Sequence, residues 1–460
     1  PSRMAEVLNR VIEKAIRGSA PAQINVPRDY WTQVIDIELP PIVRFERQGG
    51  GKDAIERAAK MLSDAKFPVI LSGAGVVIGD AINECKDLAE KLDAPVCNGY
   101  QHNDSFPGSH PLAVGPLGYN GSKAAMQLIS KADVVLALGT RLNPFSTLPG
   151  YGIDYWPKNA NIIQVDMNPD RIGLTKKVTV GIAGDAKQVA KQILDKLSSN
   201  AGDSGREERK NLIHQTKSAW LQTLTSLDHE DDDPGTVWNK EARERDKDRM
   251  SPRQAWRAIQ AAMPEDAIIS SDIGNNCAIG NAYPTFEKPR KYLAPGLFGP
   301  CGYGFPSILG AKIGCPNTPV IGFAGDGAFG ISMNEMSSCA REEWPAITMV
   351  IFRNYQWGAE KRNSILWFDD NFVGTELDPE LSYAKVANAC GLKGVTVKTM
   401  DETTKAIKKS CEDQAKGITT FIEIILNQEL GEPFRRDAMK KPVQVAGISK
   451  EDMKPQKSLI

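Results

Sequence analysis

Hydrophobic and polar positions alternate in two rhythms through the first half of the chain. Apolar residues recur at helical spacing in "AIERAAKMLSDA" (54–65), "AINECKDLAEKL" (81–92) and "DAKQVAKQILDKL" (185–197). Short, almost wholly apolar runs lie between them, including "PVILSGAG" (68–75), "ADVVLALGTRL" (132–142) and "NIIQVDMNP" (161–169). Strands that alternate with helices in this way are typical of a parallel sheet covered on both faces. We therefore predict an α/β domain over residues 41–200.

The last part of the chain, residues 251–460, repeats this pattern. Ser251 and Pro252 supply an N-cap and a first helical position for the helix "RQAWRAIQAAMP". The runs that follow and end in polar or glycine turns are "DAIISSDIGNN" (266–276), "TPVIGFAGDG" (318–327) and "AITMVIFRN" (346–354). Between them, "GPCGYGFPSILGAKIG" is a glycine turn that leads into a helix. We predict a second α/β domain here, so that the chain holds two three-layer domains with parallel sheets.

The segments outside these two domains have other patterns. Residues 4–18 show helical spacing and residues 21–27 resemble a short strand, but one helix and one strand cannot bury a core. We expect residues 1–40 to be the tail of a third domain whose earlier part lies outside this chain, rather than a decoration of the next domain. Residues 201–250 are polar and heavily charged, which predicts a linker with a helix inside it.

Composition and charge narrow the functional classes. With 460 residues the chain is too long for one core, which agrees with two or three domains. Its 56 Lys and Arg residues balance 57 Asp and Glu residues, so no general attraction to nucleic acid or to an anionic membrane is expected. The sequence lacks an apolar run of bilayer length and an apolar signal-peptide core, so we expect a cytoplasmic protein. The eight cysteines are scattered without Cys-x-x-Cys, which argues against a zinc site or a disulfide framework.

The Gly-Ala-Gly motif at residues 73–75 follows a predicted strand and raises the question of a dinucleotide-binding loop. The third glycine of that fingerprint is missing, because Ile78 occupies its place. Asp166, at the end of another strand, either contacts a ribose hydroxyl or caps the turn before Pro169. We favour a plain strand-to-helix turn and a turn cap, and the nucleotide alternative stays open at this point.

Two predicted strands end in oxygen-bearing side chains. Asp326 stands between Gly325 and Gly327, and Asn354 ends the next apolar run 28 residues later. A lone Gly-Asp-Gly is more often a surface turn, but ligands of open α/β sheets bind beyond the carboxyl ends of the strands. Carboxylate and amide oxygens suit Mg²⁺, and exposed amides at a helix N-terminus suit a phosphate. If the two strands are neighbours, the sequence predicts a metal-bridged diphosphate, with the polar cluster 272–276 beside it.

These motifs resemble the signature of the thiamine-diphosphate-dependent enzymes, in which Gly-Asp-Gly is followed after about 25 to 30 residues by Asn. The segments "SDIGNN", "GPCGYGFPSILGAK", "GDGAFGISMNE" and "FRNYQWG" occur in the order expected of that family's diphosphate-binding domain. The resemblance implies thiamine diphosphate and Mg²⁺ as cofactors, with Asp326, Asn354 and the backbone carbonyl of Gln356 as metal ligands. It also implies the domain order: the end of a pyrimidine-binding domain, a Rossmann-like central domain and the diphosphate domain.

The resemblance further implies the cofactor contacts. The residues assigned to the cofactor are Gly274, Asn275, Asn276, Gly299, Cys301, Gly325, Asp326, Gly327, Ala328, Asn354 and Gln356. Cys301 stands where many members carry a larger apolar residue that bends the cofactor. The glutamate that activates the cofactor belongs to the pyrimidine-binding domain and normally comes from a partner subunit. We therefore assign no catalytic acid or base in this chain, and we expect a homodimer or homotetramer.

Within that family the chain is similar to the sulfoacetaldehyde acetyltransferases, over residues 105–158, 356–363 and 430–443. This resemblance implies that sulfoacetaldehyde and phosphate are converted into acetyl phosphate and sulfite. Two anions near the cofactor require fixed cations. The candidates are Lys361 and Arg362, just beyond the loop of residues 354–358 that we call the metal loop, and Arg435 and Arg436 in the C-terminal segment. Each pair could equally be a solvated surface charge.

Two other functions remain open from the sequence. One is an acetolactate-synthase-like carboligase, which usually carries a flavin in its central domain. The other is a non-catalytic scaffold subunit. The four histidines all precede the predicted diphosphate domain, so a histidine base from that domain is excluded.

Overall fold

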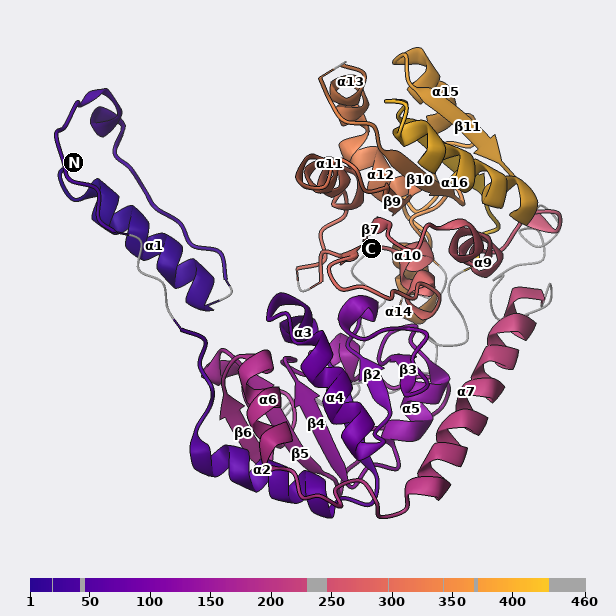
Figure 1. Ribbon diagram of the computed structural model, residues 1–460. Helices are drawn as coiled ribbons and strands as arrows, with labels where there is room; N and C mark the ends of the chain where they lie inside the picture. The colour runs from indigo at the N-terminus through magenta and orange to yellow at the C-terminus, as the bar shows by residue number, and fades with distance from the viewer. Residues whose placement is uncertain are drawn as a thin grey trace.

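The computed structural model describes residues 1–18, 20–41, 46–229, 246–296, 298–341, 343–367 and 371–429. Two six-stranded sheets form the body of the molecule (Figure 1). The strand orders are β3-β2-β1-β4-β5-β6 and β11-β12-β10-β9-β7-β8, and every pairing between these strands is parallel. The predicted fold class, α/β with two parallel-sheet domains, is confirmed.

The first sheet belongs to the central domain, and its middle strands are buried along their whole length. Its strands are β1 (Pro68–Ser72), β2 (Val96–Asn98), β3 (Ala113–Pro116), β4 (Val134–Leu138), β5 (Asn161–Asp166) and β6 (Val180–Ala183). Its helices are α2 (Lys52–Asp64), α3 (Ala74–Ile78), α4 (Ile82–Leu92), α5 (Lys123–Ile129) and α6 (Ala186–Lys196). Helix α6 begins where predicted, because the Asp185 carboxylate accepts hydrogen bonds from the amides of Lys187 and Gln188 at 3.1 and 3.2 Å.

The second sheet carries the strands whose ends the sequence singled out. Its strands are β7 (Ile268–Ser271), β8 (Tyr292–Leu293), β9 (Val320–Gly325), β10 (Thr348–Arg353), β11 (Lys393–Val397) and β12 (Thr420–Ile425). Its helices are α9 (Pro252–Ala262), α10 (Asn275–Ile279), α11 (Gly304–Gly314), α12 (Asp326–Ser332), α13 (Met336–Cys339), α14 (Gly358–Trp367), α15 (Tyr383–Ala389) and α16 (Met400–Gln414). The predicted cap of α9 is present, because Ser251 and Gln254 exchange side-chain hydrogen bonds with each other's amides.

Alternate residues of β10 enter two different cores, which makes this domain three-layered. Val350 and Phe352 pack into a cluster with Trp256 of α9, whereas the neighbouring Met349 and Ile351 join a cluster on the opposite face. A strand that is apolar on both faces is the pattern of a parallel sheet with helices on each side. The continuous apolar run 346–352 therefore follows from the burial of both faces of the sheet.

The remaining helices lie outside the two sheets. Helix α1 (Met4–Gly18) has no buried residue and stands apart from the body in Figure 1. Helix α7 (Arg206–His229) lies in the segment predicted as a linker, and its Trp220 packs on Tyr151 with ring centroids 5.6 Å apart. Short 3-10 helices are η1 (Arg28–Thr32), η2 (Asn103–Ser105), η3 (Pro144–Ser146), η4 (Pro169–Arg171), η5 (Gly280–Ala282) and η6 (Met333–Glu335). Among the described residues, no helix is long and apolar enough to cross a membrane.

Buried polar contacts join the central domain to the second domain. The side-chain Nδ2 atom of Asn103 donates to the backbone carbonyls of Asn281 and Pro284, each at 2.8 Å. The Asp104 carboxylate accepts from the backbone amides of Lys291 and Tyr292 at 3.0 and 3.3 Å. The bond from Tyr292 satisfies a backbone amide of β8, the strand at one edge of the second sheet.

Candidate active site

The carboxyl ends of β9 and β10 lie side by side. The two strands pair in parallel up to Phe352 and Gly325, so the residues that follow, Asp326 and Asn354, leave the sheet at neighbouring positions. The amide of Tyr355 donates to the Asp326 carboxylate at 2.6 Å, which ties the two strand ends together. The expected adjacency of these two strands is confirmed.

The Asp326 carboxylate is buried and held by hydrogen bonds. Its Oδ2 atom accepts from Tyr355 and from Nη1 of Arg353, the latter at 3.1 Å, and its Oδ1 atom accepts from the amide of Gly327 at 3.0 Å. Burial raises the pKa of Asp326 to about 6, although the Arg353 guanidinium and these hydrogen bonds oppose the rise. A cation at this place would favour the ionised carboxylate that burial disfavours.

Asn354 and Gln356 leave buried amide oxygens without hydrogen-bond partners. Both side chains are buried, and neither Oδ1 of Asn354 nor Oε1 of Gln356 has a partner among the described residues. Tyr355, between them, has a φ of 60°, a left-handed conformation that is strained for a residue with a Cβ. Buried carbonyl oxygens without partners cost free energy unless a ligand satisfies them. The metal loop is therefore built as an acceptor site.

This set of donors fits Mg²⁺. Asp326 offers a carboxylate, Asn354 an amide oxygen without a partner, and the backbone of the loop offers carbonyl groups, all of them the hard oxygen ligands that Mg²⁺ prefers. Within the described residues, no group of three or more His, Cys, Asp or Glu side chains could hold a metal ion. A cation in this part of the chain would thus be held by mixed carboxylate, amide and carbonyl oxygens.

The end of β7 supplies the third side of the site. Gly274 has a φ of 131° and directly precedes α10, where Asn275 and Asn276 are both buried. A Cβ on Gly358 would lie 3.3 Å from Nδ2 of Asn275, so this asparagine lies against the metal loop. Oδ1 of Asn276 has no hydrogen-bond partner within the described ranges of the chain. The polar turn after β7 and the loop after β10 therefore meet.

Asp272 shapes the glycine turn that contains Gly299 and Cys301. Its Oδ1 atom accepts from the amide of Gly302 at 3.1 Å and its Oδ2 atom from that of Gly304 at 2.7 Å. Gly299 has a φ of 67°. Burial raises the pKa of the Cys301 thiol, and the Asp272 and Glu360 carboxylates add to the rise.

The three residues around the aspartate differ in what they pack against. Apart from its chain neighbours, no atom of the described residues lies within 4 Å of a Cβ built on Gly325, whereas a Cβ on Gly327 would come within 2.8 Å of the Trp357 ring. Gly327 is therefore required by the approach of the metal loop, and Gly325 leaves open space. Ala328 is buried in the first turn of α12. The contacts of these residues with a diphosphate remain a prediction.

Two of the four cations predicted to bind substrate anions, Lys361 and Arg362, lie among the described residues, and two do not. Lys361 is fully buried, and its ammonium group pairs with Glu376 and donates to Oε1 of Gln428 at 3.4 Å. Arg362 is buried beside it. Arg435 and Arg436 lie outside the described residues. The assignment of these four residues to substrate anions remains a prediction.

The Gly-Ala-Gly motif of the central domain is a tightly packed turn. A Cβ on Gly75 would lie 2.6 Å from the Cα of Gly139, and the amide of Gly75 already donates to the Gly139 carbonyl at 2.8 Å. At the next strand end, Asp166 accepts from the amide of Asn168 at 2.9 Å, the turn cap that the sequence analysis favoured. Both features have structural partners, and the Gly75 amide is not available to a phosphate.

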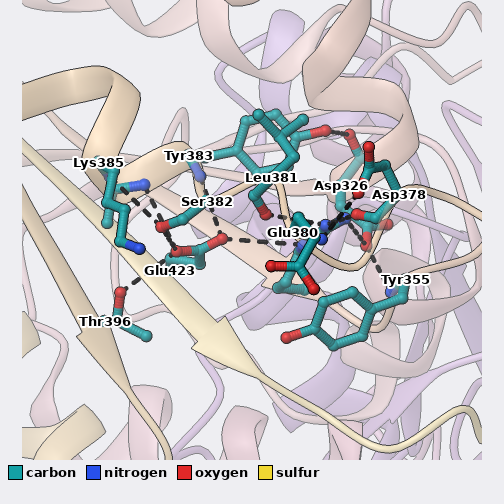
Figure 2. A network of polar contacts seen from close by, with 12 residues as sticks. Asp326, Tyr355, Asp378, Glu380, Leu381, Ser382, Tyr383, Lys385, Thr396 and Glu423 are labelled. Atoms are coloured by element: carbon teal, nitrogen blue, oxygen red, sulfur yellow. Dashed lines mark hydrogen bonds and ion pairs between the residues drawn. The ribbon is translucent and has the colours of Figure 1, made fainter. Parts of the chain in front are cut away.

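Sequence reasoning missed the ion cluster behind Asp326. Arg353 and Glu423 are both buried, and Nε of Arg353 lies 3.8 Å from Oε1 of Glu423. Figure 2 shows Glu423 with Ser382 and Tyr383 on one side of this cluster and Asp326 on the other. The signal was visible in "AITMVIFRN", where an arginine ends an apolar strand next to Asn354. An arginine in such a run is rarely buried without a carboxylate partner.

Comparisons with known proteins agree with this geometry. The family profile "Thiamine pyrophosphate enzyme, central domain" matches residues 55–193, and "Thiamine pyrophosphate enzyme, C-terminal TPP binding domain" matches residues 272–424. A probable sulfoacetaldehyde acetyltransferase of Rhizobium meliloti (strain 1021) is 78% identical over 459 residues, which are 100% of this chain and 78% of that protein. A sulfoacetaldehyde acetyltransferase of Roseovarius nubinhibens is 73% identical over 99% of this chain and 76% of its own length. A probable acetolactate synthase large subunit of Methanocaldococcus jannaschii is 28% identical over 89% of this chain and 68% of its own length.

Proposed function

Because the chain belongs to the sulfoacetaldehyde acetyltransferase family of thiamine pyrophosphate enzymes, we propose that it transfers an acetyl group from sulfoacetaldehyde to phosphate, with release of sulfite. The match at 78% identity covers the whole chain, so its span includes the metal loop and the turn around Cys301 as well as the core. The products are acetyl phosphate and sulfite. More distant acetolactate synthases share the fold at 28% identity, which supports the narrower assignment.

The observation that carries the cofactor assignment is the pair of neighbouring strand ends with unsatisfied buried oxygens. Asp326 and Asn354, with the backbone carbonyl of Gln356, would hold Mg²⁺, and the turn with Asn275 and Asn276 would contact the diphosphate. Bound thiamine diphosphate supplies a carbon nucleophile for the aldehyde and a sink for the negative charge that develops there. The protein's part is to bind the diphosphate, orient it and exclude water.

The substrates place a second demand on the site. A sulfonate and a phosphate both carry negative charge, and buried cations on either side of the metal loop in sequence are Arg353 and the two residues Lys361 and Arg362. The ammonium group of Lys361 pairs with Glu376. We infer that Lys361 and Arg362 raise the positive potential at the loop, and that Arg435 and Arg436 contact a substrate anion. In addition, we propose that the protein works in the cytoplasm as a homodimer or homotetramer.

The test is sulfite release from sulfoacetaldehyde, measured with and without phosphate in the full-length protein. We expect release that depends on Mg²⁺, thiamine diphosphate and phosphate, and its loss in Asp326→Ala because the metal loses its carboxylate. The central-domain variant Asp166→Ala is the matched control, since its carboxylate caps a turn away from the site. Phosphate-independent condensation of two keto acids, together with a flavin absorption band, would instead indicate the acetolactate-synthase-like reaction.

A further inference from the structure

Arg353 is the hub of the buried cluster behind the metal loop. Its guanidinium contacts Oδ2 of Asp326 at 3.1 Å and the carboxylate of Glu423 at 3.8 Å, and all three side chains are at most 2% exposed. The same group lies over the Tyr355 ring, 4.2 Å from the ring centroid. Two carboxylates that share one guanidinium leave the cluster with one net negative charge. An arginine so placed determines where both carboxylates point.

The hydrogen bonds divide the two oxygens of Asp326 between different tasks. Oδ2 accepts from both Arg353 and the amide of Tyr355, whereas Oδ1 accepts, among the residues that the structure describes, only from the amide of Gly327. An ionised carboxylate oxygen has about two acceptor positions, so Oδ2 is saturated and Oδ1 keeps one position. The free position belongs to the oxygen that a divalent cation would take.

Arg353 also fastens the segment that follows the metal loop. Its Nη2 atom donates to the carbonyl of Leu381 at 2.9 Å and to that of Asp378. The same segment bonds to the metal loop, because Trp357 donates to the carbonyl of Thr375 at 2.8 Å. Figure 2 shows Asp378 and Leu381 near Asp326 and Tyr355. The Arg353 side chain thus connects the metal loop, Asp326 and the segment of residues 375–381.

The second side of the cluster holds Glu423, the other carboxylate that pairs with Arg353. Glu423 accepts hydrogen bonds from the Ser382 hydroxyl at 2.6 Å, the Tyr383 amide at 3.1 Å and the Thr396 hydroxyl at 3.2 Å. The Tyr383 hydroxyl in turn donates to the backbone carbonyl of Asp326 at 2.8 Å. The Ala384 amide is a fourth donor at 3.5 Å, so the Glu423 carboxylate is held in place as an ion-pair partner 3.8 Å from Nε of Arg353.

We propose that Arg353 is a positioning residue of the cofactor site, which locks Oδ2 of Asp326 and thereby presents Oδ1 to the divalent cation. This inference rests on the proposed function, because it takes the cation to be the Mg²⁺ that holds thiamine diphosphate. Removal of a group that orients a metal ligand typically lowers metal affinity about 10- to 100-fold.

The test is the Kd for Mg²⁺ at saturating thiamine diphosphate, measured by isothermal titration calorimetry on the full-length protein. We expect Arg353→Met to raise this Kd about 10- to 100-fold, and Arg353→Lys to raise it less, about 3- to 10-fold, because an ammonium group keeps one donor toward Oδ2. Arg209→Lys is the control, since Arg209 is an equally buried arginine that donates to five backbone carbonyls of the central domain. It should lower the melting temperature and leave the Kd for Mg²⁺ unchanged.

A double variant separates positioning from charge balance. Arg353→Met/Glu423→Gln removes one positive and one negative charge, so the cluster keeps its single net negative charge. This variant provides the measurement if Arg353→Met alone does not fold. We expect the double variant to fold and to retain the raised Kd. A Kd within twofold of the wild-type value in the double variant, or in a folded Arg353→Met, overturns the inference. Absence of Mg²⁺-dependent thiamine diphosphate binding in the wild-type protein would instead overturn the proposed function.

Discussion

The carboxyl ends of β1, β4 and β5 in the central sheet use their polar groups within the domain, whereas the ends of β7, β9 and β10 leave several of theirs unused. In the central sheet, Gly75 donates to the Gly139 carbonyl and Asp166 caps its own turn. In the second sheet, the side-chain oxygens of Asn276, Asn354 and Gln356 are buried without partners among the described residues. Both edges have the same parallel architecture.

The difference shows that a parallel sheet offers a binding edge but does not by itself make one. Ligands of such sheets gather at the carboxyl ends of the strands, yet packing can close that edge. In the central sheet, two glycine turns approach until a Cβ on Gly75 would lie 2.6 Å from the Cα of Gly139. In the second sheet, a Cβ on Gly325 would meet no atom of the described residues within 4 Å, its chain neighbours aside. An edge with open space and unsatisfied oxygens is the one to expect at a binding site.

The largest effect is expected from Asn354→Leu. Leucine has a similar volume but lacks the amide oxygen, so we expect the Kd for Mg²⁺ with thiamine diphosphate to rise at least about 100-fold. The melting temperature without ligands should stay the same or rise slightly, because a buried oxygen without a partner is removed. Calorimetry and thermal unfolding of the same preparations measure both effects.

Gln164→Leu is the matched exchange at the central edge. This buried amide donates to the carbonyls of Thr140 and Arg171 and accepts from the amide of Gly173 at 2.8 Å. We expect its loss to cost about 2 kcal/mol or more and to lower the melting temperature by roughly 4 to 8 °C, with cofactor binding unchanged. If both variants lost stability equally and neither lost affinity, the contrast between the two edges would be wrong.

A second pair of variants tests the packing of the two edges. Gly75→Ala places a methyl group against the backbone of Gly139, and overpacking of this kind typically costs about 1 to 3 kcal/mol. Gly325→Ala, with a φ of −68° and open space, should change unfolding by less than about 0.5 kcal/mol without ligands. Urea unfolding followed by circular dichroism compares them. Equal stability of the two variants would contradict the packing difference.

The smallest effect is the change in the free energy of unfolding with pH that His102 of the central domain causes. Burial lowers the pKa of His102 to about 4, with a further contribution from the Arg141 guanidinium. Because the unfolded chain binds the proton at a higher pH, near 6.5, stability is present above that pH and is lost as the pH falls toward 4. Between pH 7 and pH 5 we expect a loss of roughly 1 to 2 kcal/mol from this group.

His102→Gln is the variant for this measurement. It should reduce the fall in melting temperature between pH 7 and pH 5 by a few degrees relative to the wild-type protein. The control variant is His110→Gln. The His110 side chain is hydrogen-bonded to Glu90, whose side chain is more exposed than that of His110. A pH dependence that is identical in the wild-type protein and in His102→Gln would exclude His102 as its source.

Much of the fold and part of the site were accessible from the sequence because they depend on local patterns. The alternation of apolar runs and helical spacing indicated both parallel sheets, and Ser251 with Pro252 marked the start of α9. Asp326 and Asn354 stood out because each lies at the end of a predicted buried strand. The sequence could not decide whether residues 73–75 form a phosphate-binding loop or a packed turn, since both need the same glycines.

The helices, the strands and the polar residues at their ends follow from local sequence patterns, since periodicity, caps and glycine turns act over a few residues. The contact of β9 with β10, and the position of Arg353 between Asp326 and Glu423, became visible in the folded protein, where residues far apart along the chain meet. Pairing of strands and burial of charges depend on long-range contacts, which local spacing does not encode.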